Sequence, residues 1–272
     1  MPVNAPAHLT ARIEAAHAIL AEAGTRALAY FAEVESLAVE AKANGQDVVS
    51  IADRAVEQLV RGRLAQAFPE DGFLGEESGT APARSDFVWV LDPIDGTSCF
   101  VHGIANWCVA LALVERGRTV AGFILDPNAQ ETFIAVHGAG ATLNGRPIRV
   151  DTRTDLRHGL TSVGASFRVP AQLIAAVIRR LLEAGGMFVR GGSGALSLAH
   201  VACGRLAAYY EPHMHAWDCL AGLLLIREAG GWTHDFAASG DLAAGGPVIG
   251  CAPQLCEDLL GLIEAARMEA LA

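Results

Sequence analysis

The chain has 272 residues, of which 52% are apolar and 18% charged, and its formal net charge is -10 at pH 7. This length and apolar content allow one large domain or two closely packed halves. The acidic balance argues against nucleic acid as a partner, because binding to a phosphate backbone requires a basic surface. An acidic protein that binds an anionic substrate must supply positive charge locally, and metal ions bound by carboxylates are one source.

Other function classes are excluded by single residue types. Lys42 is the one lysine, and no Gly-Lys-Ser/Thr segment occurs, which rules out the phosphate loop of most kinases and ATPases. The six cysteines form no Cys-x-x-Cys pair and mostly lie in apolar runs, which is typical of reduced thiols in a cytosolic protein. No signal peptide opens the chain and no uncharged apolar run reaches about 18 residues, so we expect a cytoplasmic protein without a membrane span.

The first half of the chain is predicted to form two helices beside a largely antiparallel sheet. Apolar residues at helical spacing predict one helix over 7–38, ended by Asn44-Gly45, and a second that begins after Ser50 and ends at Phe68-Pro69. A short strand is expected at 72–75, and longer strands at 87–91, 107–114, 119–125 and 132–136. Asn144-Gly145 is typical of a tight hairpin.

After residue 150 the pattern changes to alternating strands and helices. Helices are expected near 170–184, 194–203, 218–229 and 253–268. Strands are expected near 159–163, 206–210 and 247–250, with a further short strand between the first two of these helices. Alternation of this kind predicts an α/β layer. We therefore expect an N-terminal α+β half over 1–150 and a C-terminal α/β half over 151–272.

Four acidic segments fall at the ends of expected strands or the starts of expected helices. They are 75–78 (Gly-Glu-Glu-Ser), 92–97 (Asp-Pro-Ile-Asp-Gly-Thr), 217–218 (Trp-Asp), and Asp47 with Asp53. A buried strand brings Asp92 to its carboxyl end, where Pro93 and Gly96 permit a tight bend. Asp92 and Asp95 then face one point, with the carbonyl of Ile94 between them. Several oxygens directed at one point suit Mg²⁺.

Each segment also has a simpler explanation. Residues 93–96 fit a plain turn that closes a strand. Glu76 and Glu77 fit a solvated loop pair, although adjacent residues of a strand point to opposite faces, so that one of them looks inward. Asp218 fits an ordinary helix cap, and Asp53 fits a capping box with Ser50.

The segments together resemble the inositol monophosphatase family. Residues 89–97, followed by 100–103 (Phe-Val-His-Gly), are similar to its first signature, and 217–231 is similar to its second. Residues 75–78 match its Gly-Glu-Glu-Ser segment, and 47–53 matches its Asp-x-Val-Thr-x-x-Asp segment, with Ser50 for the usual Thr. Residues 192–196 and 204–211 resemble substrate-side segments. The likeness runs in order from about residue 40 to 235.

The resemblance implies both a fold and an activity. The fold is a five-layer α-β-α-β-α sandwich shared with fructose bisphosphatases. The activity is hydrolysis of a small phosphate monoester with two or three Mg²⁺ ions, with inositol 1-phosphate as the leading substrate. The resemblance also implies a lithium-sensitive homodimer that acts on a phosphorylated polyol, with no nucleic acid or membrane as partner.

The resemblance further implies roles for individual residues. The metal ligands would be Glu76, Glu77, Asp92, the Ile94 carbonyl, Asp95 and Asp218. Glu76 and Thr97 would position the attacking water, and Asp53 would orient the Thr97 hydroxyl. The substrate-binding residues would be Asp95, Gly96, Thr97, Gly194, Ala195, Glu211 and Asp218, with phosphate on the N–H groups of 96 and 97.

Some residues depart from the family pattern. Gly194 stands where the family usually has Ala, Ala207 where Asp is common, and Pro212 follows Glu211 in a stretch that often contains Gly. These departures question inositol as the alcohol and leave the hydrolysis itself intact. The alternatives are histidinol phosphate, fructose 1,6-bisphosphate, NADP and adenosine 3′,5′-bisphosphate, or a regulatory binding protein that keeps the fold without catalysis.

Three further motifs suggest other functions. His213 and His215 fit either a zinc pair or a pocket lining. Residues 191–194 (Gly-Gly-Ser-Gly) lack the register of a dinucleotide loop. Lys42 is either part of the water network at the metal site, as its position in the family suggests, or a solvated lysine near a helix end.

Overall fold

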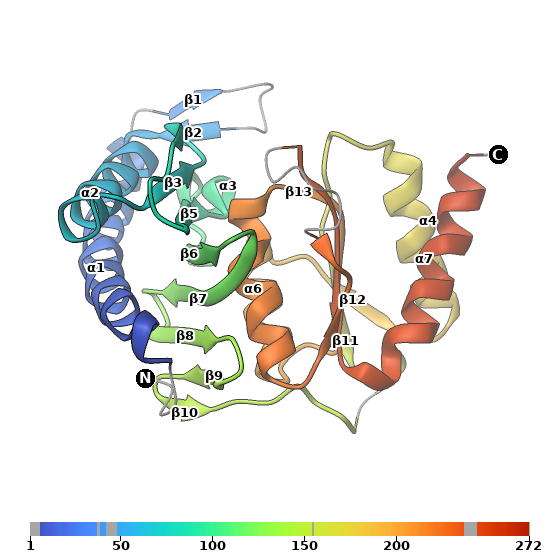
Figure 1. The fold of residues 1–272 in the computed structure, drawn as a ribbon. Coiled ribbons are helices and arrows are strands. Elements are labelled where there is room, and N and C mark those ends of the chain that lie inside the picture. The colour runs from blue at the N-terminus through green and yellow to red at the C-terminus, as the bar shows by residue number, and fades with distance from the viewer. Residues whose placement is uncertain (1–5, 37–38, 42–47, 154, 237–243, 272) are drawn as a thin grey trace.

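The computed structural model describes residues 6–36, 39–41, 48–153, 155–236 and 244–271, arranged as five layers (Figure 1). Helices α1 and α2 cover one face of an eight-stranded sheet, α5 and α6 fill the space between this sheet and a five-stranded one, and α4 and α7 cover the far side. This order confirms the predicted α-β-α-β-α sandwich. None of the helices in the described ranges is long and apolar enough to cross a membrane.

The elements before residue 150 build the eight-stranded sheet, a separate two-stranded sheet formed by the first two strands, and three helices. The helices are α1 (Ala7–Phe31), α2 (Ile51–Ala67) and α3 (Thr97–Val101), with a 3-10 turn η1 (Val34–Ser36). The strands are β1 (Val39–Ala41), β2 (Val48–Ser50), β3 (Gly72–Gly75), β4 (Gly79–Ala81), β5 (Phe87–Asp95), β6 (Cys108–Glu115), β7 (Arg118–Asp126), β8 (Glu131–Val136), β9 (Gly140–Leu143) and β10 (Arg146–Pro147).

The elements after residue 150 build the second sheet and the remaining helices. The helices are α4 (Ala171–Glu183), α5 (Gly194–Ala202), α6 (Ala216–Glu228) and α7 (Cys256–Ala270), with a 3-10 turn η3 (Pro253–Leu255). The strands are β11 (Leu160–Val163), β12 (Met187–Val189), β13 (Ala208–Met214), β14 (Trp232–Thr233) and β15 (Gly246–Cys251).

The sheet topology agrees with the predicted change from a largely antiparallel sheet to alternating strands and helices. The first sheet has the order β10-β9-β8-β7-β6-β5-β3-β4, and its pairs are antiparallel except β3 with β5. The second has the order β12-β11-β13-β15-β14, and β11 pairs in parallel with both neighbours. The Asn144-Gly145 hairpin is confirmed, with positive φ at both residues. The division into halves at residue 150 stays a prediction.

Four predicted bounds were wrong or lie outside the described residues. Helix α1 ends at Phe31, short of residue 38. Strand β5 continues past Leu91 to Asp95, because a shift in its register with β6 accommodates Pro93. Strand β13 extends to Met214, whereas residue 210 was expected. Asn44-Gly45 lies outside the described residues.

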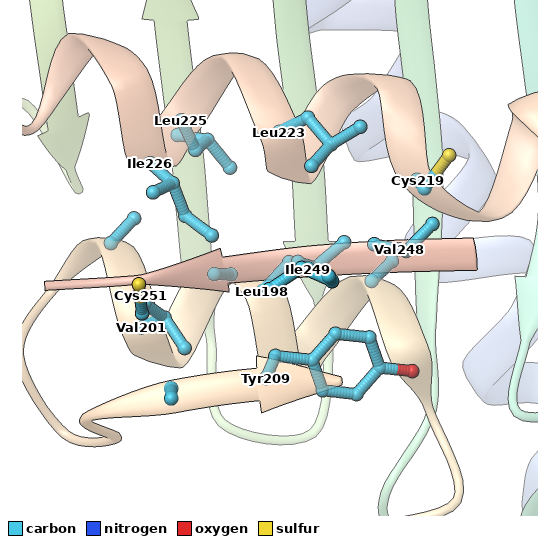
Figure 2. Close-up of a cluster of buried hydrophobic side chains, with 14 of the residues drawn as sticks. Leu198, Val201, Tyr209, Cys219, Leu223, Leu225, Ile226, Val248, Ile249 and Cys251 are labelled. Carbon is cyan, nitrogen blue, oxygen red and sulfur yellow. The ribbon is translucent and has the colours of Figure 1, made fainter. Parts of the chain in front are cut away.

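Helix α6 is buried on nearly all sides because it lies between the two sheets. Two glycines permit its close packing: a Cβ on Gly122 of β7 would lie 2.9 Å from the Cα of Ala221, and a Cβ on Gly222 would overlap Leu198 of α5. Figure 2 shows the core that forms around this helix, with side chains from α5, α6, β13 and β15 in one cluster. The amino end of α6 is thereby placed at the edge of the first sheet.

Candidate active site

A cavity of about 210 Å³ lies where the carboxyl end of β5, the β3–β4 turn, β13 and the amino ends of α5 and α6 meet. Its polar and charged lining residues are Glu76, Asp92, Asp95, Thr97, Ser98, Ser162, Arg168, Arg190, Ser193, Ser197, Tyr209, Glu211 and Asp218. Segments from both halves of the chain therefore contribute to one site.

The centre of the site is a cluster of three carboxylates. One oxygen each of Asp92, Asp95 and Asp218 lies within 4.8 Å of the others. Asp92 and Asp95 belong to β5, where the backbone N–H of Ile94 donates to Asp92 Oδ1 at 2.9 Å. The shift in β5 register falls between these two aspartates, so both reach the cavity. The expected convergence of Asp92 and Asp95 is present, on a bulged strand where a turn was predicted.

Hydrogen bonds from α5 orient the carboxylate of Asp95. The hydroxyl of Ser193 and the backbone N–H of Ala195, the latter at 2.8 Å, both donate to Asp95 Oδ2. Ser193 also accepts the N–H of Leu196 and so caps α5. Ser193 was placed in a substrate-side segment without a role of its own, although a serine immediately before an apolar helix is a recognisable cap. Ala195 is fully buried and does not line the cavity, contrary to its expected place beside the alcohol.

Asp218 caps α6 and joins the carboxylate cluster at the same time. Its Oδ2 accepts the backbone N–H of His215 at 2.9 Å, and it lines the cavity. His215 stacks on Trp217 with ring centroids 4.6 Å apart, and the His213 ring lies 5.2 Å from that of His215. Across the described ranges, the three aspartates are the one group of His, Cys, Asp or Glu side chains close enough to share a metal ion, so the histidine pair has no third ligand there.

Burial and mutual repulsion raise the pKa values of these carboxyls. Burial, followed by the charge of Glu76, raises the pKa of Asp92 and of Asp218 well above the usual range. Burial raises the pKa of Asp95 to about 6, although the hydrogen bonds from Ser193 and Ala195 oppose the shift. A divalent cation among these groups would remove the repulsion, and all-oxygen donors are what Mg²⁺ prefers. The donor set therefore fits that ion.

Thr97 and Asp53 are in contact, as the resemblance implied. The Thr97 hydroxyl lies 3.1 Å from Asp53 Oδ1 and 3.0 Å from the Ile94 carbonyl. The other carboxylate oxygen of Asp53 accepts the N–H of Ser50 at 2.8 Å, which is the predicted capping box. The Asp53 carboxylate therefore caps helix α2 and contacts the Thr97 hydroxyl at the same time. Gly96 precedes α3 with a φ of 94°, a conformation that favours glycine.

The two adjacent glutamates were expected to point to opposite faces of a strand. Both lie in the turn between β3 and β4 and not on a strand. Glu76 lines the cavity, and Glu77 is not among its lining residues. The backbone around them contacts Glu57 of α2, a residue that the sequence analysis did not single out.

Strand β13 contributes another part of the cavity lining. The hydroxyl of Tyr209 donates to Glu211 Oε2, and burial raises the pKa of Glu211 to about 7. A Cβ on Gly194 would overlap the methyl group of Met214 and lie 2.9 Å from the Tyr209 hydroxyl oxygen. Met214 thus explains why glycine stands at 194. Arg168 and Arg190 also line the cavity and were not predicted.

Two motif residues, Asp47 and Lys42, lie outside the described residues, and their predicted roles stay predictions. Ala207 is buried and Pro212 lies within β13. All six cysteines are free, and Cys108 is buried beside Ser193, with its sulfur 3.6 Å from the hydroxyl oxygen.

Fold and site together define a two-sheet α/β protein with a buried carboxylate cluster suited to divalent cations. The chain belongs to the inositol monophosphatase family, whose model matches residues 8–267. It is 41% identical over 216 residues to the Nus factor SuhB of Xylella fastidiosa, covering 79% of this chain and 78% of that one.

Two further relatives are named as inositol monophosphatases (IMPases). The inositol-1-monophosphatase of Rhizobium meliloti is 39% identical over 225 residues, covering 80% of this chain and 83% of that one. The solved structure of the IMPase from Thermotoga maritima superposes with a TM-score of 0.85 at 28% identity, covering 95% of this chain and 98% of that one.

Proposed function

We propose that the chain hydrolyses a small phosphate monoester with Mg²⁺, and that inositol 1-phosphate is its leading substrate. The observation that supports this most is the cluster of Asp92, Asp95 and Asp218 in a cavity that also contains Glu76 and Thr97. Two or three ions would be held by Glu76, Glu77, Asp92, the Ile94 carbonyl, Asp95 and Asp218. Bound Mg²⁺ would neutralise the phosphate charge and lower the pKa of a coordinated water.

Side chains of the protein would orient the water that attacks the phosphate. The Thr97 hydroxyl has partners at Asp53 and Ile94, so its proton is committed and its lone pair is available to a water. Glu76 lines the same cavity, and its carboxylate would accept a hydrogen bond from that water. A water fixed between these two groups would face a phosphate on the N–H groups of Gly96 and Thr97. Such positioning supplies much of the rate in phosphoryl transfer.

The alcohol of the substrate would occupy the side formed by Gly194 and Glu211. The Glu211 carboxylate lines the cavity and has the Tyr209 hydroxyl as a donor to one of its oxygens. The other oxygen would accept hydrogen bonds from hydroxyls of a polyol. Asp95 and Asp218 would contact both the ions and the substrate. We keep a homodimer and a cytoplasmic location as expectations.

A regulatory binding role is the second candidate function. It is favoured by the 41% identity to a relative that is named Nus factor SuhB. A binding protein without catalysis has no need of a carboxylate cluster whose charges repel one another. The retained cluster therefore favours hydrolysis, alone or beside a binding role.

A phosphate-release screen tests the proposal. The purified chain is offered inositol 1-phosphate, histidinol phosphate, fructose 1,6-bisphosphate, NADP and adenosine 3′,5′-bisphosphate, with Mg²⁺ and with excess chelator. We expect Mg²⁺-dependent release that is fastest from inositol 1-phosphate. The absence of phosphate release from every substrate, or full release in excess chelator, would contradict Mg²⁺-dependent hydrolysis by this site. If another substrate releases phosphate faster than inositol 1-phosphate, that compound becomes the proposed substrate.

A further inference from the structure

One face of helix α2 contacts Thr97 and the β3–β4 turn at three successive helical turns. Asp53, Glu57 and Arg61 are spaced four residues apart, so they lie on the same side of the helix. Asp53 contacts Thr97, and Arg61 donates to the Ser78 hydroxyl at 2.6 Å. Glu57 lies between them and contacts the backbone of the β3–β4 turn. The helix therefore links the Thr97 side of the cavity to the Glu76 side.

Glu57 is a buried carboxylate whose two oxygens both accept backbone hydrogen bonds. The residue is 2% exposed. Its Oε2 accepts the N–H of Glu77 at 2.9 Å, and its Oε1 accepts the N–H of Ser78 at 2.7 Å. A charged acceptor in a buried place makes these bonds stronger than neutral ones. Two bonds to successive N–H groups fix the orientation of both peptide planes.

The same turn is fixed at a third successive peptide. The N–H of Glu76 donates to the carbonyl of Leu91 in β5 at 3.2 Å. The backbone on both sides of the Glu76 side chain is thus bonded to other elements, to β5 before it and to α2 after it. The direction in which this side chain enters the cavity depends on both.

Gly75 is required for this contact. A Cβ on Gly75 would lie 2.5 Å from Glu57 Oε2 and 2.7 Å from its carboxyl carbon. Any larger residue at position 75 would therefore press on this carboxylate, and also on the Phe73 ring, whose Cε1 would lie 2.7 Å away. The glycine gives a second way to perturb Glu57 without removing its charge.

We propose that Glu57 is a positioning residue for metal binding, acting through the turn that carries Glu76. Glu57 is not among the residues that line the cavity, so its effect on a bound ion would be indirect. The inference rests on the proposed function, since it assigns Glu57 a role in the Mg²⁺ site of that function. Residues that orient a metal ligand typically contribute about 10- to 100-fold to metal affinity.

The test uses Glu57→Gln, which keeps the shape and replaces one acceptor with an amide that opposes a backbone N–H. Mg²⁺ affinity is measured by calorimetric titration of the metal-free protein, and phosphate release is measured against Mg²⁺ concentration. We expect Mg²⁺ affinity to fall about 10-fold or more, with kcat largely recovered at saturating Mg²⁺. Gly75→Ala should give the same loss with the Glu57 charge intact.

The matched control is Asp71→Asn. Asp71 is also a buried carboxylate near the start of β3, and it accepts hydrogen bonds from Arg12, Ser85 and Trp89. Its loss should lower the melting temperature and leave Mg²⁺ affinity unchanged, which is the behaviour of a purely structural carboxylate.

The outcomes separate the two levels of the proposal. Unchanged Mg²⁺ affinity in both Glu57→Gln and Gly75→Ala would overturn the role of Glu57 and leave the proposed function standing. No Mg²⁺ binding by the unaltered protein would refute the proposed function and this inference with it. If Glu57→Gln does not fold, a normal Mg²⁺ affinity in Gly75→Ala suffices to reject the inference.

Discussion

In the metal-free protein, Asp95 should contribute a loss of stability as the pH rises, and Asp95→Asn should remove that contribution. Burial raises the pKa of Asp95 from 3.8 to about 6 in the folded state. Between these values the folded state binds more protons than the unfolded state, so the free energy of unfolding falls as pH rises. Below pH 3.8 the contribution is fully present, and above pH 6 it is lost. A shift of about 2 units corresponds to about 3 kcal/mol as an upper limit.

The assay compares urea unfolding of the two proteins in excess chelator at several pH values from 4 to 8. Buried Trp89 and Trp107 provide the fluorescence signal. Other carboxyls have lowered pKa values and act in the opposite direction, so the quantity of interest is the difference between unaltered protein and variant. We expect this difference to change by up to about 3 kcal/mol in favour of the variant as the pH rises. A difference independent of pH would refute the reasoning. Saturating Mg²⁺ at pH 7.5 should then stabilise the unaltered protein more than the variant.

Three further predictions concern single side chains of the site. Asp92→Asn removes a central charge of the cluster and should lower Mg²⁺-dependent phosphate release by about three orders of magnitude or more; a loss under tenfold at saturating Mg²⁺ would be inconsistent with metal ligation. Thr97→Ala should reduce kcat with little change in Mg²⁺ affinity, and Asp53→Asn should reduce kcat and also lower stability by about 1 kcal/mol through its cap. A normal kcat with a lowered melting temperature would leave Asp53 as a cap alone. Glu211→Gln should raise KM for inositol 1-phosphate and spare an aryl phosphate, since only the polyol has hydroxyls to bind; a uniform change across substrates would show that Glu211 does not contact the alcohol.

The parts of the fold that the sequence predicted are those with long, regular hydrophobic patterns. Helix α2 and the strands β6, β7 and β8 fall within a residue or two of their expected bounds. The short elements β1, β2, β4 and β14 were missed, because two or three residues carry too little periodicity to detect. The length of strand β5 was underestimated because a proline usually ends a strand. In the structure a local shift in register with β6 allows the strand to continue past Pro93.

The residues of the candidate site also divide into those that the sequence predicted and those that it did not. Its acidic residues were found because each lies in a short contiguous motif. The roles of Glu57 and Ser193 were missed because their partners lie far along the chain: Glu57 contacts a residue 20 positions away and Ser193 one 98 positions away. The capping roles of Asp53 and Asp218 were readable locally, but their second contacts depend on how the layers pack.

Gly222 within helix α6 and Gly122 on the neighbouring strand β7 bear on which inherited changes this protein tolerates. Gly222 lies one turn after Asp218 on the same helix, and Gly122 faces Ala221 across the interface with β7. Neither interface has clearance for an added methyl group, so a change to alanine at either position must shift helix α6 or the element packed against it. Because that helix carries a cluster carboxylate, natural variation at 122 and 222 is constrained through the site as well as through the core. A collection of random variants selected for lost activity and retained folding should therefore contain substitutions at these two positions, although neither residue lines the cavity.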